Sequence, residues 1–185
     1  MSPILLAAAL AIWLESGKPV LFRQVRVGRG FERFQILKFR TMLARSAGPL
    51  ITVHGDSRIT RIGGFLRITK LDEIPQFWNV LRGEMSIVGP RPEVPEYVEL
   101  FKHRYKGILT MRPGITDLAS LHFHNEESIL GNSPDPMREY RNRILPRKLD
   151  LAEQYLRERN LLFDLAIIAR TVFLIVFRHK PATSR

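Results

Sequence analysis

Hydrophobic residues are concentrated in two stretches near the ends of the chain. The first covers residues 3–14, and the last runs from about Leu161 to Phe177, where Asp164 and Arg170 interrupt it. As a helix, the first stretch would reach about 18 Å, roughly half of the hydrocarbon core of a bilayer. We therefore expect a half-depth helix, either re-entrant or lying at the interface, with a buried core helix as the alternative.

The last apolar stretch is also a poor membrane span, because two charged side chains fall inside it. Packing on the domain and lying at a membrane surface as an amphipathic helix are both open for it. No stretch of the chain is a convincing transmembrane span.

Short strands are predicted between residues 20 and 42. Residues 24–27 alternate polar and apolar positions, which is the period of a strand with one buried face. Gly28 and Gly30 then indicate a turn, so the pattern is typical of short strands or a hairpin.

A short helix is predicted to begin near Asp72 and to end by Gly83. Pro75 is tolerated in the first turn of a helix, and apolar residues recur there at helical spacing: Ile74, Phe77, Trp78 and Leu81. Asp72 and Glu73 would then lie at the helix N-terminus, where free N–H groups and the helix dipole favour ionised carboxylates. An ionised Asp is a usable nucleophile or metal ligand, whereas the alternative is that Asp72 only caps the helix.

Further helices are predicted over residues 93–106 and in the region after residue 133, where Pro146 and Asn160 punctuate them. The chain contains no internal repeat and no linker, and its length suits one domain with a real core. The pattern therefore predicts an α/β fold that is mostly helical and carries a small β-hairpin or sheet.

The charge of the chain is strongly positive and unevenly distributed. The formal net charge is +11, and twelve basic but only three acidic residues precede Leu71. Such a balance implies an anionic partner, which can be nucleic acid, an anionic membrane face or a phosphorylated substrate. The basic residues are not interleaved with aromatic residues in an RNA-binding pattern. The absence of cysteine excludes disulfides, thiolate metal sites and cysteine nucleophiles.

Five basic residues are candidates for phosphate binding. Lys38 and Arg40 share one face of the second predicted strand, although a solvated face is an equally good interpretation. Arg91 lies between two prolines, in a stiff loop that suits bidentate phosphate binding by a guanidinium. Arg112 lies in a second Pro/Gly loop, and Arg67 shortly precedes the acidic pair. An acidic pair at the edge of a basic field suits the handling of an anion near a metal ion.

Seven stretches of the chain follow one another in the order of the motifs of a single family. By these stretches the chain resembles the bacterial sugar transferases, or monotopic phosphoglycosyl transferases, over nearly its whole length. Any one motif is weak, but seven in register are specific. They are Val-Leu-Phe-Arg-Gln (20–24), Lys-Phe-Arg-Thr-Met (38–42), Asp-Ser-Arg-Ile-Thr (56–60), Leu-Asp-Glu-Ile-Pro-Gln (71–76), Asn-Val-Leu (79–81), Met-Ser-Ile-Val-Gly-Pro-Arg-Pro (85–92) and Arg-Pro-Gly-Ile-Thr (112–116).

The resemblance implies a membrane-associated monotopic α/β enzyme at the cytoplasmic face of the bacterial inner membrane. Residues 1–15 would form a re-entrant type of helix, and residues 16–185 the catalytic domain. Such an enzyme transfers a sugar phosphate from a UDP-sugar to a polyprenyl (undecaprenyl) phosphate and releases UMP. The reaction initiates the synthesis of exopolysaccharide, O-antigen or glycoconjugates. The resemblance leaves a homodimer open.

The resemblance also implies roles for individual residues. Asp72 would be the nucleophile of an Asp-Glu dyad, and Mg²⁺ would be bound next to it by Asp72 and Glu73. Arg67 matches the arginine of the family's phosphate site, and Arg91 and Arg112 match its Pro-Arg-Pro and Arg-Pro-Gly loops. Attack on a diphosphate brings one anion toward another, and Mg²⁺ and fixed arginines offset that repulsion. Whether Glu73 helps to hold the metal or acts as a base is open.

Two departures from the family pattern are visible. The basic, apolar segment that usually precedes the Ser-Pro break is absent before Ser2, so we expect only half of the helix hairpin. After Thr116 the common Gly-Trp-Ala-Gln is replaced by Asp-Leu-Ala-Ser, beginning at Asp117, so the identity of the donor is open.

Two other classes of function compete with this prediction. One is a basic membrane- or nucleic-acid-binding module without catalysis, in which the basic residues would matter collectively and Asp72 hardly at all. The other is a soluble phosphatase- or kinase-like enzyme, which would transfer phosphate to water or a soluble acceptor.

Overall fold

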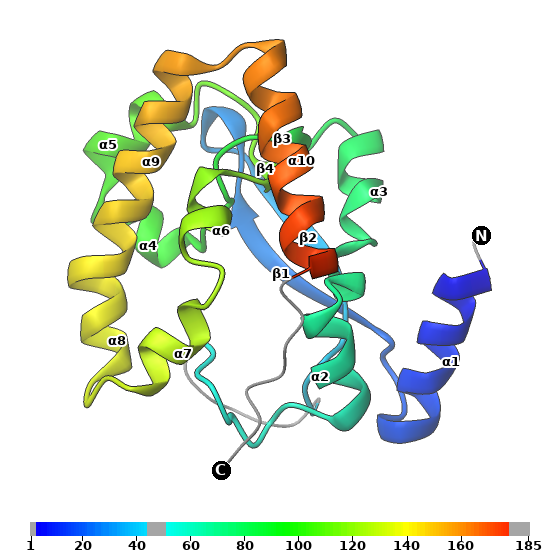
Figure 1. Ribbon diagram of the computed structural model, residues 1–185. Helices are drawn as coiled ribbons and strands as arrows, with labels where there is room; N and C mark the ends of the chain where they lie inside the picture. Colours follow the sequence, from blue (N-terminus) through cyan, green and yellow to red (C-terminus); the bar gives the residue numbers. More distant parts are fainter. Residues whose placement is uncertain (1–2, 44–50, 178–185) are drawn as a thin grey trace.

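The computed structural model describes residues 3–43 and 51–177, in which helices lie around a small hairpin (Figure 1). Helix α1, Pro3–Ser16, lies at the edge of the molecule beside α2, Arg61–Ile68. One side of α1 packs on the domain through Ile12, in a buried cluster with Phe39 and Leu66. The other side exposes apolar side chains: Ile4, Leu6, Leu10, Trp13 and Leu14. The helix is therefore a core element on one side and presents an apolar face on the other.

The predicted hairpin is confirmed. Strands β1, Leu21–Val27, and β2, Arg33–Phe39, pair antiparallel, with Leu21 opposite Phe39 and Val27 opposite Arg33. A short 3₁₀ turn, Arg29–Phe31, joins them, and Gly30 has a φ of +69°, a left-handed conformation that glycine adopts without strain. The far end of β2 places Lys38 beside the acidic segment.

The acidic segment forms a 3₁₀ turn, η2 (Leu71–Glu73), followed by helix α3, Gln76–Leu81. It follows α2, which begins after Thr60, whose hydroxyl oxygen accepts a hydrogen bond from the backbone N–H of Gly63 at 3.0 Å. Lys70 separates α2 from the turn with a left-handed φ of +56°. The predicted helix is thus at the right place, but its regular part begins after Pro75 rather than at Asp72.

A second small sheet brings the two Pro/Gly loops together. Strand β3, Ser86–Val88, pairs in parallel with β4, Gly114–Thr116. Gly114 contacts the backbone of Gly89 so closely that any side chain at position 114 would collide with it. Between these strands, the single helix predicted over residues 93–106 is two helices, α4 (Pro95–Leu100) and α5 (Lys102–Ile108). They meet at Phe101, which packs against two separate apolar clusters.

The C-terminal part of the chain is helical, as predicted. It consists of α6 (Leu118–His122), α7 (Glu126–Gly131), α8 (Pro136–Glu139), a π-helical turn (Tyr140–Ile144), α9 (Leu145–Glu158) and α10 (Leu161–Phe177). Helix α9 buries Leu145, Leu149 and Tyr155 together with the charged Lys148, and it exposes charged residues such as Arg147 and Asp150. Helix α10 has the predicted bounds, buries Ile167 and lies over β3 and β4 (Figure 1).

The predicted fold class is confirmed as a mostly helical α/β fold with small sheets. Within residues 3–43 and 51–177, no helix has both the length and the apolar content needed to cross a bilayer, as the sequence also indicates.

Candidate active site

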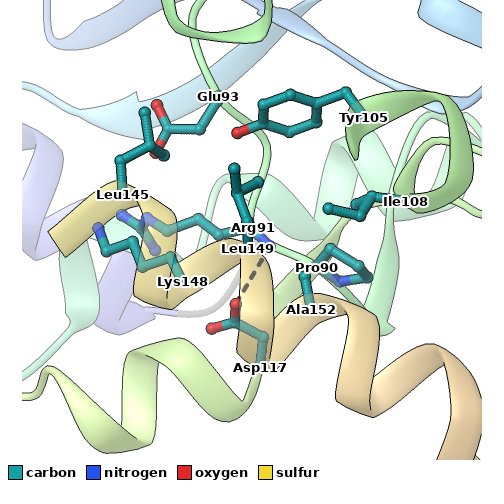
Figure 2. A pocket seen from close by; sticks show the side chains of 10 residues that line it. All are labelled: Pro90, Arg91, Glu93, Tyr105, Ile108, Asp117, Leu145, Lys148, Leu149 and Ala152. Carbon is teal, nitrogen blue, oxygen red and sulfur yellow. Dashed lines mark hydrogen bonds between the residues drawn. The ribbon is translucent and has the colours of Figure 1, made fainter. Parts of the chain in front are cut away.

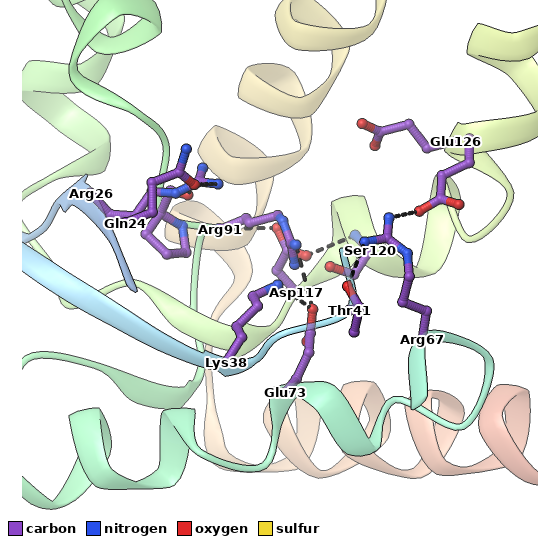
Figure 3. Close-up of polar contacts among 12 residues, drawn as sticks. Gln24, Arg26, Lys38, Thr41, Arg67, Glu73, Arg91, Asp117, Ser120 and Glu126 are labelled. Carbon is purple, nitrogen blue, oxygen red and sulfur yellow. Dashed lines mark hydrogen bonds and ion pairs between the residues drawn. The ribbon is translucent and has the colours of Figure 1, made fainter. Parts of the chain in front are cut away.

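Glu73 is the centre of a compact charge cluster (Figure 3). Lys38 Nζ lies 2.7 Å from Glu73 Oε1, and Arg91 Nη2 lies 3.5 Å from the same oxygen. Burial by itself would raise the pKa of Glu73, but the positive charges of Lys38 and Arg91 outweigh it and hold the pKa well below its usual range. Glu73 is therefore ionised at neutral pH, and its charge is balanced within the protein.

Asp72, the adjacent residue, has the opposite surroundings. Its side chain is buried, and Oδ1 has no hydrogen-bond partner among the described residues. Burial, together with the negative charge of Glu73, raises the pKa of Asp72, although Lys38, Lys70 and Arg67 act against this shift. The result is a carboxylate with a raised pKa and one buried oxygen that has no hydrogen-bond partner among the described residues.

The expectation that a helix N-terminus stabilises an ionised Asp72 is wrong. Asp72 lies in a three-residue 3₁₀ turn, which lacks the aligned peptide dipoles of a longer helix. The cap position of that turn is Lys70, and α3 begins later, after Pro75. Asp72 is therefore not a cap residue of either element, and its side chain is buried.

The Arg91 loop is held in place by two buried acidic residues, Glu93 and Asp117, to which the sequence patterns assigned no role in the site. The backbone N–H of Arg91 donates to Asp117 Oδ2 at 3.2 Å, while Asp117 Oδ1 caps α6 by accepting from the N–H of Ser120 at 2.7 Å. Glu93 accepts from the Tyr140 hydroxyl at 2.6 Å and pairs with Arg26 at 3.4 Å. A polar residue directly after Pro92 in a stiff loop was the available signal for Glu93.

A cavity of about 20 Å³ lies behind the Arg91 loop, between it and α9 (Figure 2). Its polar lining consists of Arg91, Glu93, Tyr105, Asp117 and Lys148. It has room for about one water molecule and is far too small for a sugar nucleotide.

Arg67 lies close to the carboxylates but is partly engaged elsewhere. Its Nη1 donates to Thr41 Oγ1 at 3.3 Å (Figure 3). Its Nη2 forms an ion pair with Glu127. Its Nε is buried and has no partner in the described part of the chain. The Arg67 charge acts on Asp72, which places it within electrostatic range of that carboxylate.

Two of the predicted phosphate-binding residues are not brought to this cluster. Arg40 follows the end of β2, and its Nη2 donates to the carbonyl oxygens of Ser16 and Gly17, each at 2.8 Å. It thus anchors the end of α1 and does not form a joint grip with Lys38. Arg112 is exposed, and its guanidinium lies beside Gly83.

The segment from Leu71 to Leu81 has an unusual distribution of polarity. Its inner face carries three buried polar residues, Asp72, Gln76 and Asn79. Its outer face exposes three large apolar residues: Phe77, Trp78 and Leu81. The amide of Asn79 makes three hydrogen bonds. Its oxygen accepts from the backbone N–H of Leu37 at 3.1 Å, and its nitrogen donates to the carbonyl oxygen of Gln35 at 2.8 Å and to the Glu84 carboxylate at 2.7 Å.

The residues at this site fit a divalent cation only in part. No group of three or more potential metal ligands occurs within the described ranges. Mg²⁺, however, is commonly bound by one or two carboxylates together with substrate phosphates. The unpartnered Oδ1 of Asp72 suits that role, whereas Glu73 is already neutralised by Lys38 and Arg91.

Comparison with known proteins finds several similar sugar-phosphate transferases. The chain is similar to a UDP-glucose:undecaprenyl-phosphate glucose-1-phosphate transferase of Caulobacter vibrioides, 43% identical over 92% of this chain and 62% of the relative. A protein of the same name from Escherichia coli K12 is 38% identical over 94% of this chain and 36% of its own length. A UDP-N-acetylgalactosamine-undecaprenyl-phosphate N-acetylgalactosaminephosphotransferase of Aeromonas hydrophila is 45% identical over 65% of this chain and 30% of its own.

The chain spans less than two thirds of the length of each of these relatives. The family model of the bacterial sugar transferases nevertheless matches residues 1–178, which include the hairpin, the Asp72–Glu73 turn and both Pro/Gly loops. This match establishes that the chain belongs to the bacterial sugar transferase family.

Proposed function

We propose that this chain transfers a sugar phosphate from a UDP-sugar to polyprenyl phosphate, with Asp72 as the nucleophile. The observation that carries the proposal is the contrast between the two neighbouring carboxylates. Asp72 is buried with an unpartnered oxygen, whereas Glu73 is paired with Lys38 and Arg91. Pairs of acids whose pKa values are driven apart are typical of sites that divide two chemical roles. The names of the relatives support the UDP-sugar donor and the undecaprenyl phosphate acceptor.

In the first step, an oxygen of the ionised Asp72 attacks the phosphorus that carries the sugar. The bond from that phosphorus to the bridging oxygen breaks, and UMP leaves with the electron pair. The sugar phosphate is then held on Asp72 as an acyl phosphate. The raised pKa of Asp72 suits this step, because a more basic carboxylate is a better nucleophile once it is ionised.

In the second step, an oxygen of polyprenyl phosphate attacks the same phosphorus. The bond to Asp72 breaks, the carboxylate is restored, and polyprenyl diphospho-sugar is released. Lys38, Arg91 and Arg67 supply positive charge around the transferred group. Glu73 acts as a positioning residue in this proposal, because it holds Lys38 and Arg91 together beside the nucleophile.

Mg²⁺ is the proposed cofactor, and Asp72 is the residue that would hold it. When bound, it would neutralise charge on the diphosphate and on the departing UMP. We expect activity to be lost on removal of divalent cations and restored by Mg²⁺. Full activity after exhaustive chelation would exclude this cofactor.

The acceptor is a lipid, so the site is proposed to work at the cytoplasmic face of the bacterial inner membrane. Apolar side chains are exposed on α1, on α2 (Phe65 and Ile68), on α3 (Phe77 and Trp78) and on the ends of α10. The exposed apolar face of α3 is directly opposite the side of the segment that carries Asp72. Contact of these faces with lipid would hold the domain at the membrane surface, with Asp72 one short segment away from the side that meets lipid.

Release of UMP from UDP-sugars, with and without polyprenyl phosphate in detergent, tests the proposed reaction. We expect turnover only when the lipid acceptor is present. Turnover with water or a soluble acceptor alone would favour a phosphatase- or kinase-like enzyme. Binding to anionic liposomes without any UMP release would favour a binding module.

A further inference from the structure

Gln76 carries a buried side-chain amide, and the proposed reaction assigns no role to it. Only 2% of the residue is exposed, and its Nε2 has no hydrogen-bond partner among the described residues. Asn79, one turn further along the same inner face, shows the contrasting case, since its amide makes three hydrogen bonds. A buried amide donor without a partner destabilises a protein, so an apolar side chain would serve the fold better at position 76.

The backbone places Gln76 on the same face as the nucleophile. Residues 71–81 continue as right-handed turns across Pro75, with the N–H of Ile74 donating to Leu71 O at 3.3 Å and that of Phe77 to Ile74 O at 3.0 Å. Asp72 and Gln76, four residues apart, are both buried, while Phe77 is exposed. Two unpartnered polar atoms, Asp72 Oδ1 and Gln76 Nε2, therefore lie on the inner face of one short segment.

We infer that Gln76 is a substrate-binding residue whose amide donates a hydrogen bond to a non-bridging oxygen of the phosphoryl group that Asp72 attacks. This inference rests on the proposed function. The phosphorus must come within bonding distance of Asp72, which brings its oxygens near the adjacent turn of the segment. Lys38 and Arg91 share their charge with Glu73, so a neutral donor that is free of other partners adds a contact that these cations do not supply.

Such a donor assists the reaction when its hydrogen bond strengthens as charge develops on the phosphoryl oxygens. A preformed donor of this kind contributes about 100-fold to turnover in other enzymes. We therefore expect kcat to fall by about that factor when the amide is removed, with a smaller change in KM for the UDP-sugar.

The test compares Gln76→Met with Asn79→Leu, two replacements of a buried amide on the same face of α3. For Gln76→Met we expect an unchanged or higher Tm together with the loss in kcat, because the variant removes a donor that the free protein leaves unpaired. For Asn79→Leu we expect a clear fall in Tm, because three hydrogen bonds are lost. Both are measured by thermal unfolding and by UMP release.

Wild-type turnover in Gln76→Met would overturn the inference. So would a fall in its Tm as large as that of Asn79→Leu, since the amide would then be structural. Failure of the wild-type chain to release UMP from any UDP-sugar would instead contradict the proposed function, and is recognised before any variant is made. Formation of UMP in the first turnover without acceptor distinguishes a contact in the donor step from one that forms only with the lipid phosphate.

Discussion

The site has two halves, one around Asp72 and one around Glu73, and they shift the pKa values of these adjacent carboxylates in opposite directions. Both side chains are largely removed from solvent. Glu73 meets two cations and its pKa is lowered, whereas Asp72 meets no hydrogen-bond partner at Oδ1 and its pKa is raised. The difference shows that burial alone does not set the state of an acid, because the placement of Lys38 and Arg91 decides it. We interpret the Glu73 side as structural support and the Asp72 side as reactive.

The largest effect is expected from Asp72→Asn, which should reduce transfer by more than about 10⁴-fold. An amide cannot attack phosphorus and cannot replace a charged metal ligand. Because folding raises the pKa of Asp72, the contribution of this group to stability is present at low pH and lost as the pH rises through the folded-state pKa. The Tm of Asp72→Asn at neutral pH should therefore equal or exceed that of the wild type, as thermal unfolding would measure. A folded variant with near-normal activity would remove Asp72 from the nucleophile role.

Glu73→Gln should markedly lower the stability of the fold, whereas Asp72→Asn should leave it unchanged or raise it. Its removal leaves Lys38 and Arg91 without their shared counter-charge in a mostly buried place. We expect the free energy of unfolding to fall by about 3 kcal/mol, the low end for a buried ion pair, as measured by urea denaturation at neutral pH. An unchanged stability would mean that the charge cluster does not support the fold.

A smaller effect separates the two loop arginines. Arg91→Lys keeps the charge but loses the planar guanidinium beside Glu73, so kcat/KM should fall by roughly 10- to 100-fold. Arg112 is exposed and lies beside Gly83, so Arg112→Lys should stay within about fivefold of wild type. The two variants are compared by steady-state UMP release. Equal losses in both would show that Arg112 joins the site when substrate binds.

The smallest effect is expected in the pH dependence of the wild type. Asp72 must be ionised to attack, and burial raises its pKa above the usual value for an aspartate. Activity should therefore decline, as the pH is lowered, at a higher pH than an ordinary aspartate would give. Glu73 has a lowered pKa and does not contribute to this limb. A kcat/KM profile that stays flat down to about pH 4 would contradict the raised pKa.

Much of the fold follows from the sequence, because local patterns determine it. Alternation and Gly30 predict the hairpin, and the apolar run of α10 predicts both of its ends. The helical spacing of Phe77 and Trp78 locates α3, but it does not show that these residues face outward and that Gln76 and Asn79 face inward. The side of a helix that meets the protein is set by its tertiary partners, here β2.

The sequence predicts which kinds of residue belong to the site, but not how they are arranged around the two carboxylates. The sequence supplies the acidic pair and the surrounding cations, and the structure brings Lys38 and Arg91 to Glu73. Strand alternation places Arg40 with Lys38, but β2 ends at Phe39, so Arg40 turns toward the end of α1. The raised pKa of Asp72 arises from burial among segments distant in sequence, which no local pattern reports.

The most direct test of the account is mass spectrometry of the protein after a rapid quench with a UDP-sugar and Mg²⁺, in the absence of lipid acceptor. We expect an increase in mass equal to one sugar phosphate, located on Asp72, that disappears when polyprenyl phosphate is added and never forms in Asp72→Asn. An active enzyme that forms no adduct under these conditions, or forms it on another residue, would contradict the central claim.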